Sequence, residues 1–336
     1  MLRIGIDLGG TNLRGAAFDD QSLARPSEPP DKASEVARWS HKEAVGADRD
    51  PAAIVERVAA IADRLASDSS GPIPIGVGIA AMLRDRRGTV ANSPHLGWRE
   101  VPFGALLARR LGSRFQLGVY NDVNAITWGE SVAGAARGCR DVLAVYVGTG
   151  IGGGVIAGGQ LVEGATNCAG EIGHVKVRWD DQAEPCACGG RGCVEAYVGG
   201  SYLERRIARE LAGRKKHLAV QLAGRIEDVM PGHVDQAAAN GDEWALGLWS
   251  ELAPLLAIAL GNAVTLLNSE RLVLGGGVLS RTPTLCQLTE TAMMVVTPVP
   301  LLEPLEIVMA ELGDTAGLVG AAALARSGVS LISTAE

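Results

Sequence analysis

Apolar residues recur along this chain in two spacings, one typical of strands and one typical of helices. Alternating or short apolar runs predict strands over residues 2–8, 15–18, 73–80, 115–120, 142–147, 271–275 and 305–310. Helical spacing predicts longer elements over residues 51–67, 102–112, 197–211, 243–267 and 315–326. Both halves of the chain contain strands and helices, so we predict an α/β fold. Residues 21–50 and 180–185 follow neither spacing, and we expect irregular structure there.

Glycines gather where two of these strands end. The first strand leads into Asp7-Leu-Gly9-Gly10-Thr11-Asn12, and the strand over 142–147 leads into Gly148-Thr149-Gly150-Ile-Gly-Gly-Gly. Each turn joins two strands, and its backbone N–H groups can hold a phosphate. Asp7 can hold a hydrated Mg²⁺ at the base of the first turn. Neither turn has the Walker A or dinucleotide-binding pattern, and either alone is compatible with an ordinary hairpin.

The similarity of the two hairpins indicates an internal duplication with one phosphate hairpin in each half of the chain. We therefore expect two α/β domains around a central cleft. A third cluster, Gly275-Gly276-Gly277, ends the strand over 271–275. Backbone without side chains allows a flat ring to approach closely, so we interpret Gly275 and Gly276 as an adenosine contact. A tight turn between a strand and a helix gives the same pattern.

One histidine and three cysteines lie within a stretch of 20 residues: His174, Cys186, Cys188 and Cys193. Three thiolates and one imidazole are the ligands of a closed tetrahedral zinc site. Inert thiols or a disulfide are alternatives, but cysteines in a C-x-C pattern seldom satisfy disulfide geometry. Glu171 and Glu195 bracket this stretch, so a metal that stiffens the loop would also orient their carboxylates. The remaining cysteines, Cys139, Cys168 and Cys286, are predicted to be reduced core thiols.

Asn121 and Asp122 follow the strand over 115–120. Ligands of open α/β sheets bind beyond the carboxyl ends of the strands. An acid at this place can accept the proton of a substrate hydroxyl that attacks a phosphate. A helix N-cap role explains the same two residues equally well.

Charge and hydropathy exclude some classes of function. The chain of 336 residues has a net charge of −7, and it lacks the clustered basic residues of a nucleic-acid-binding protein. The apolar run over 252–267 is interrupted by Pro254, Gly261 and Asn262, so we predict a buried helix and no membrane span. The first strand leaves no room for a signal peptide, and the thiols suit a reducing compartment, so we predict a cytoplasmic protein.

The motifs quoted above occur in the order found in the ROK family (repressors, open reading frames, kinases), and the chain resembles its bacterial glucokinases. The similarity covers essentially the whole chain, and the motif Cys186-x-Cys-Gly-x-x-Gly-Cys193-x-Glu195 is highly specific. The resemblance implies the actin-like ATPase (ribonuclease H-like) fold. It also implies a small domain over 1–120 plus 312–336, and a large domain over 121–311 that contains the zinc loop, residues 171–195.

The resemblance further implies a role for each motif. Asp122 would be the catalytic base that activates the 6-hydroxyl of a hexose. The sugar hydroxyls would bind Asn121, Glu171, His174 and Glu195. The ATP phosphates and Mg²⁺ would face Asp7, Gly9, Gly10, Thr11, Asn12, Thr149 and Gly150, with adenosine at Gly275 and Gly276. A structural Zn²⁺ would be held by His174, Cys186, Cys188 and Cys193. These four ligands leave no open position for catalysis, and the second nitrogen of His174 would contact the sugar.

The predicted function is therefore ATP-dependent phosphorylation of glucose in carbohydrate metabolism (glycolysis), by a homodimer that the resemblance alone implies. N-acetylmannosamine, N-acetylglucosamine, fructose and allose are alternative acceptors, and polyphosphate is an alternative donor. Repressors of the family carry an N-terminal winged helix-turn-helix before the kinase-like core. Here the core is predicted to begin at residue 2, so we do not expect a repressor. Asp122 and the two hairpins disfavour a sugar-binding protein without turnover. The loop over 91–98 resembles the sugar-side loop of the family but has His95 where Asn is common. Which sugar hydroxyl this loop contacts therefore stays open.

Overall fold

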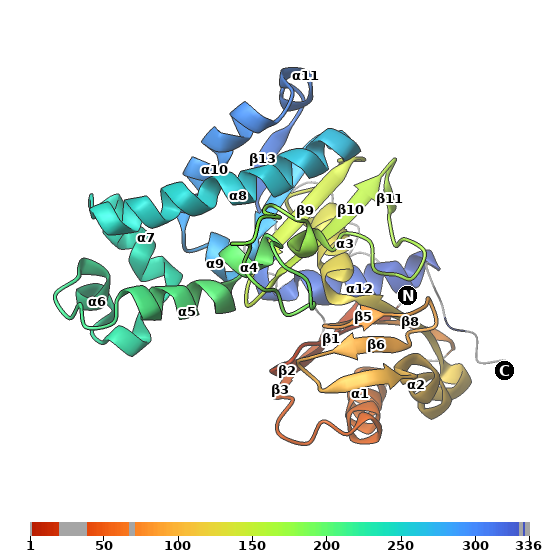
Figure 1. Ribbon diagram of the computed structural model, residues 1–336. Coiled ribbons are helices and arrows are strands. Elements are labelled where there is room, and N and C mark those ends of the chain that lie inside the picture. The colour runs from red at the N-terminus through yellow and green to blue at the C-terminus, as the bar shows by residue number, and fades with distance from the viewer. Residues whose placement is uncertain (1, 20–38, 67–70, 329–331, 333–336) are drawn as a thin grey trace. The chain divides into compact units, whose positions relative to one another are not determined.

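The computed structural model describes residues 2–19, 39–66, 71–328 and 332 (Figure 1). It divides into two compact units. Unit 1 contains residues 1–140, 154–170 and 310–336, and unit 2 contains residues 141–153 and 171–309. Compared with the domains expected from the sequence, unit 1 also takes in residues 121–140, 154–170 and 310–311. The helix that follows Asn121 belongs to unit 1 because it packs against the last helix of the chain.

Unit 1 is built on a five-stranded sheet with the strand order β3-β2-β1-β4-β8. Its strands are β1 (Arg3–Leu8), β2 (Asn12–Phe18), β3 (Trp39–Ala44), β4 (Ile73–Ile79) and β8 (Phe115–Asn121). β1, β4 and β8 are parallel to one another, whereas β2 and β3 pair antiparallel. The expectation of irregular structure is wrong over 39–44, where β3 forms by pairing with the hairpin strand β2. Residues 20–38 lie outside the described part.

Four helices within the described residues cover this sheet. Apolar side chains of β1 pack with α1 (Pro51–Leu65) and α2 (Phe103–Leu111) on one face. On the other face, β2 packs with α12 (Ala316–Ser327), and α12 packs against α3 (Asp122–Ala133). Smaller elements complete the unit: β5 (Met82–Leu83), β6 (Val90–Ser93), β7 (Trp98–Val101), η2 (Gly112–Arg114) and η5 (Gly313–Thr315).

A row of glycines across the sheet brings α12 close to it. Gly5, Gly76 and Gly118 are register partners on β1, β4 and β8. A Cβ on Gly5 would lie 2.0 Å from the carbonyl oxygen of Leu318, and one on Gly76 would lie 1.9 Å from that of Ala321. The backbone of α12 therefore rests directly on these strands, and alternation sends the large side chains of β1 to the opposite face.

Glu130 joins the end of α3 to the chain that returns from unit 2. Its carboxylate is fully buried and accepts hydrogen bonds from the backbone N–H groups of Ala135 (2.8 Å), Glu311 (3.2 Å) and Leu312 (3.0 Å). A Cβ on Gly134 would lie 2.0 Å from the carboxylate, so the loop wraps tightly around it. Glu130 thereby fixes the position from which α12 begins.

Replacing Glu130 by glutamine is expected to lower the free energy of unfolding by about 2–3 kcal/mol. One acceptor oxygen becomes an NH₂ group that faces backbone donors, so buried N–H groups lose their partners. Urea denaturation at pH 7 measures this change. Glu204→Gln on an exposed helical position is the matched control and should shift the free energy by less than about 0.5 kcal/mol. Equal stability of the two variants would contradict the structural role of Glu130.

The second sheet has the strand order β11-β10-β9-β12-β13, and the boundary of the two units falls within β10. Its strands are β9 (Val142–Val147), β10 (Ile151–Ala157), β11 (Gln160–Leu161), β12 (Arg271–Gly275) and β13 (Glu306–Met309). The helices of unit 2 are η3 (Ile172–His174), α4 (Glu195–Val198), α5 (Gly200–Glu210), α6 (Leu218–Ala223), η4 (Ile226–Asp228), α7 (Pro231–Ala239), α8 (Glu243–Leu267), α9 (Gly276–Leu279), α10 (Pro283–Val296) and α11 (Val299–Leu302). Strands and helices of this unit show the alternation that the sequence predicts.

Among the described residues, one helix, α8, has the length and the apolar composition of a membrane span. Half of its most apolar window is buried within the protein, where it packs with α7 and α10. Asp242 caps its N-terminus by accepting a hydrogen bond from the N–H of Ala245, and Trp249 is fully buried. We interpret α8 as the core helix that the sequence predicts.

Candidate active site and metal site

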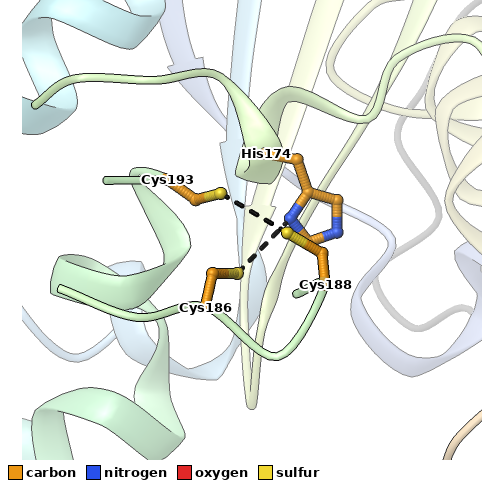
Figure 2. Close-up of side chains that lie close together, drawn as sticks. All are labelled: His174, Cys186, Cys188 and Cys193. Atoms are coloured by element: carbon orange, nitrogen blue, oxygen red, sulfur yellow. Dashed lines mark hydrogen bonds between the residues drawn. The ribbon is translucent and has the colours of Figure 1, made fainter. Parts of the chain in front are cut away.

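Four donor atoms in the zinc loop of unit 2 converge on one point (Figure 2). They belong to His174, Cys186, Cys188 and Cys193, and all lie within 4.8 Å of one another. Nδ1 of His174 is 3.7 Å from Sγ of Cys186, and the Sγ atoms of Cys188 and Cys193 are 3.6 Å apart. A tetrahedral zinc ion with Zn–S bonds of about 2.3 Å separates its sulfur ligands by roughly 3.8 Å. The donor set therefore fits zinc in both chemistry and spacing.

Glycines allow the loop to fold back on itself. The N–H of Cys186 donates to the carbonyl of Gly190 at 2.8 Å, and the N–H of Gly189 donates to the carbonyl of Cys186 at 3.0 Å. Gly189 and Gly192 have φ values of 87° and 74°, which disfavour other residues. A Cβ on Gly192 would also lie 1.7 Å from the carbonyl oxygen of Arg178. These two glycines are therefore needed to bring the three cysteines together.

Lys176 adds a positive charge to this cluster. Its Nζ donates a hydrogen bond to Sγ of Cys193 at 2.7 Å, and this contact raises the pKa of the lysine. With Zn²⁺ bound, three thiolates and one neutral imidazole would leave a net charge of −1, which the ammonium group would offset. Lys176 would thus act on a bound metal through one of its ligands.

Zinc-loaded Lys176→Met is expected to release its metal to a chelator about tenfold faster than the parent. Loss of a residue that hydrogen-bonds to a metal ligand commonly lowers metal affinity by about 10- to 100-fold, and this estimate is at the lower end. Cys193 loses its only charged hydrogen-bond donor among the described residues, so its bond to the metal is less well supported against a competing chelator. A colorimetric chelator measures the release rate. Lys215→Met removes an equally charged exposed side chain outside the loop and should leave the rate unchanged. Equal rates in both variants would contradict the role of Lys176.

Glu171 and Glu195 lie near the four converging donors. Without a metal, burial raises the pKa of Glu171, a protonated His174 opposes this shift, and the carboxylate of Glu195 adds to it. Oε2 of Glu195 accepts a hydrogen bond from the N–H of Ile151 at 2.7 Å, and its Oε1 is 3.9 Å from Sγ of Cys186. The two acids and His174 thus form one group, and Glu195 connects it to the second glycine hairpin.

The second hairpin, residues 148–151, is fixed from two sides. Its carbonyls at Gly148 and Thr149 accept hydrogen bonds from the first two N–H groups of α5, both at 2.9 Å. A Cβ on Gly150 would lie 2.5 Å from Oε2 of Glu195, so glycine is needed there. Gly276 lies nearby with a φ of 88°, and its Cβ would lie 2.4 Å from the carbonyl oxygen of Val147. The two predicted nucleotide segments of unit 2 therefore meet at the end of β9.

The first hairpin, in unit 1, places Asp7 within a small charged group. Nη1 of Arg14 is 3.6 Å from Oδ2 of Asp7, and Nη2 of Arg14 is 2.9 Å from Oδ2 of Asp314. Burial raises the pKa of Asp7 to about 6, Arg14 opposes this shift, and Asp314 adds to it. A carboxylate that burial destabilises in this way is stabilised by a cation, which fits the predicted Mg²⁺ position.

In the absence of Mg²⁺, Asp7→Asn is expected to raise the free energy of unfolding at pH 7.5 by about 2 kcal/mol. The folded pKa of about 6 lies above the unfolded value near 3.8, so the folded state binds more protons between these values. The parent protein therefore loses stability as the pH rises from about 4 to 6, and the variant lacks this loss. Urea denaturation at pH 4.5 and 7.5 measures it. A gain of equal size at both pH values would contradict the assigned titration.

His95 lies against the first hairpin, which the sequence does not reveal. A Cβ on Gly10 would lie 2.6 Å from Cβ of His95. The guanidinium group of Arg49 donates to the carbonyls of His95 and Gly10, and Trp98 donates from its Nε1 to the carbonyl of Arg49 at 2.6 Å. The loop over 91–98 is thus tied to the phosphate hairpin through Arg49.

Asn121 and Asp122 begin α3 at the carboxyl end of β8. Oδ1 of Asn121 accepts from the N–H groups of Val123 (3.0 Å) and Asn124 (3.1 Å), so Asn121 is the N-cap. Its Nδ2 donates to the carbonyl of Ala81 at 3.2 Å, which leaves one amide hydrogen for a ligand. Asp122, the first helical residue, is partly exposed and accepts from the N–H of Val123 at 2.9 Å. The cap role thus falls to Asn121.

Comparison with known proteins identifies the family. The sequence profile of the ROK family matches residues 3–327. The chain belongs to the ROK family. It is 30% identical to a glucokinase of Streptomyces coelicolor, covering 97% of this chain and 98% of that protein. It is 31% identical to an N-acetylmannosamine kinase of Citrobacter koseri, covering 83% and 84%. The crystal structure of a ROK glucokinase from Streptomyces griseus in complex with glucose and AMPPNP superposes with a TM-score of 0.75 at 29% identity, covering 98% and 100%.

The ROK assignment confirms the predicted family and the actin-like ATPase fold that ROK sugar kinases share. The predicted site residues are divided between the units. Unit 1 carries Asp7, Gly9, Gly10, Thr11, Asn12, Asn121 and Asp122. Unit 2 carries Thr149, Gly150, Glu171, His174, Cys186, Cys188, Cys193, Glu195, Gly275 and Gly276.

Four residues that the sequence does not single out support this ROK site. Arg14, Arg49 and Lys176 each contact a predicted site residue, and Glu130 holds the segment from which α12 begins. Arg14 and Lys176 could have been found as cations close in sequence to the aspartate and thiolates they contact. Arg49 and Glu130 carry no such signal, because their partners are tens to hundreds of positions away. The remaining cysteines are unbridged, as the sequence predicts.

Proposed function

We propose that this protein is an ATP-dependent sugar kinase that transfers the γ-phosphoryl group of ATP to the 6-hydroxyl of glucose. The observation that carries the proposal is the placement of a partly exposed acid and a glycine hairpin at one edge of the sheet of unit 1. Leu8, Ile79 and Asn121 are register partners at the carboxyl ends of three parallel strands. The phosphate hairpin follows the first of these strands and Asp122 follows the third. Ligands of such sheets bind at this edge.

Asp122 is the proposed general base. It accepts the proton of the sugar 6-hydroxyl, whose oxygen attacks the γ-phosphorus of ATP while the bond to the ADP oxygen breaks. Asn121 holds the start of α3 by capping it and thereby orients the carboxylate of its neighbour. The rate enhancement comes from positioning and charge stabilisation, as in phosphoryl transfer generally.

The sugar hydroxyls are proposed to bind Glu171, His174 and Glu195. The group is supported by zinc, which we infer at the four converging donors. Because Nδ1 of His174 lies on the side of Cys186, Nε2 is left to contact the sugar. All four positions of a tetrahedral ion are taken by protein, so the zinc would supply rigidity and no Lewis acidity.

The ATP phosphates are proposed to lie at the backbone N–H groups of both hairpins, with adenosine at Gly275 and Gly276. When bound, Mg²⁺ would neutralise phosphate charge, and Asp7 is the residue that would hold it. Glucose is preferred over the other acceptors because the glucokinase relative aligns over almost the full length of both chains. We also infer a cytoplasmic homodimer from the family membership.

A coupled assay that detects ADP tests the proposal. Purified protein with Mg²⁺ and ATP is given glucose, N-acetylmannosamine, N-acetylglucosamine, fructose or allose, and polyphosphate replaces ATP in a parallel series. We expect the highest kcat/KM with ATP and glucose. A higher kcat/KM with another sugar would change the proposed substrate but leave the protein a sugar kinase. The absence of ADP with every sugar would overturn the kinase proposal.

A further inference from the structure

Unit 2 contains a cavity beside the zinc loop, and its lining includes none of the residues assigned above to sugar and ATP. It has a volume of about 630 Å³ and lies between the outer side of the zinc loop, α4, α5 and one residue of α8. Pockets for small molecules commonly have volumes of 300–1,000 Å³. The cavity is therefore large enough for a phosphorylated sugar or a mononucleotide.

Arginines dominate the charge of this cavity. Arg178, Arg205, Arg206 and Arg209 line it together with Glu184, Glu210 and Glu251. Arg206 is neutralised by the two glutamates from the helices: its Nε is 2.7 Å from Glu210, and its Nη atoms are 2.9 and 2.6 Å from Glu251. This ion-pair group forms a fixed part of the wall that links α5 to α8.

The other three arginines make no hydrogen bond to a carboxylate within the part of the chain that the structure describes. The guanidinium of Arg205 lies 4.5 Å from the ring centre of Tyr202, and that of Arg178 lies 5.9 Å from the ring centre of Tyr197. Stacking on a ring holds a guanidinium in place without neutralising it. Arg209 lies one turn of α5 beyond Arg205 and is exposed. The four arginines and three glutamates of the wall give it a net charge of about +1, and the positive charge is concentrated on the three arginines that make no such hydrogen bond.

The same tyrosines connect the cavity to the metal site. The hydroxyl of Tyr197 accepts a hydrogen bond from the N–H of Glu184 at 2.9 Å, and that of Tyr202 accepts from the N–H of Ala187 at 2.7 Å. These two backbone groups flank Cys186, which is both a predicted zinc ligand and part of the cavity wall. A molecule in the cavity would therefore contact the side chains that hold the zinc loop.

We propose that this cavity binds the phosphate group of a small phosphorylated metabolite, through Arg178, Arg205 and Arg209. Guanidinium groups match phosphate oxygens in both charge and geometry, and three of them suit a dianion. The site is separate from the proposed transfer of phosphate and does not depend on which sugar is phosphorylated.

Isothermal titration calorimetry with the full-length, zinc-loaded protein tests this proposal. The probes are inorganic phosphate, glucose 6-phosphate and adenosine monophosphate, which separate recognition of phosphate alone from recognition of an attached sugar or nucleoside. The test variant is Arg205→Gln with Arg209→Gln. The matched control is Arg214→Gln with Arg281→Gln, which removes two exposed arginines of unit 2 that do not line the cavity.

We expect at least one probe to bind, with an affinity that falls tenfold or more in the test variant and is unchanged in the control. Binding to the ATP hairpins would survive the substitutions, so equal affinity in the parent and the test variant would overturn the proposal. The absence of binding of all three probes at millimolar concentration would overturn it as well. Both variants should melt within 2 °C of the parent, since their substituted side chains are exposed.

Discussion

Asp122→Asn is expected to lower kcat by about a thousandfold, within the range of roughly 10²–10⁴ that general bases contribute. Asparagine keeps the size of the side chain and its hydrogen bond to the N–H of Val123, but it cannot take the proton of the sugar hydroxyl. Because α3 is capped by Asn121, the helix should retain its geometry. Steady-state kinetics and sugar titration calorimetry measure kcat and affinity separately, and the sugar affinity should change by less than about twofold.

Asp50→Asn is the matched control for this substitution. Asp50 caps α1 in the same unit, and asparagine is an equally good cap, so neither kcat nor stability should change noticeably. A kcat of Asp122→Asn close to that of the parent would refute the base assignment. A large loss of sugar affinity would show that Asp122 mainly binds the sugar.

Cys188→Ser is expected to weaken sugar binding by about tenfold or more, the effect that loss of a metal-site partner commonly has. Cys188 is exposed, so serine itself disturbs no packing, and the effect comes from loss of the fourth ligand. Without the metal, the zinc loop is less rigid, so His174 and Glu195 are no longer held in fixed positions. The KM for ATP should change by less than about threefold, because the hairpin of unit 2 is also held by α5.

Metal analysis by mass spectrometry and sugar titrations check this prediction together. Cys168→Ser is the matched control, because its Sγ both donates to and accepts from the backbone of Leu83, and a hydroxyl retains these contacts. Its zinc content and sugar affinity should equal those of the parent. Sugar affinity that stays unchanged in zinc-free Cys188→Ser would show that the metal does not support the sugar site.

The parts of the site that could be predicted from sequence are those whose chemistry is local. The four metal donors lie in one short stretch, so their spacing alone indicates a metal site, and the structure brings them within 4.8 Å. The glycine hairpins follow strands, and the alternation of apolar residues places them at strand ends. Asn121 and Asp122 are adjacent, and a helix start after a strand predicts that one of them is a cap.

Other parts depend on contacts between distant segments and could not be predicted. Glu130 meets Leu312 across 182 positions, and nothing near either residue indicates the pairing. The division of the units follows from the packing of α3 on α12, which no local pattern encodes. The sequence does not predict β3, because its residues, Trp39–Ala44, are mostly polar and form a strand by pairing with β2.

The return of the chain to unit 1 constrains the order in which the protein can fold during synthesis. The glycine row of β1 and β4 receives the backbone of α12, which is translated after the whole of unit 2. The segment over 171–309 is translated earlier and can form its own core while unit 1 still lacks one layer. Until α12 has been translated, the face of β1 and β4 that it covers stays open to chaperones and proteases, and β1 is the strand that bears Asp7.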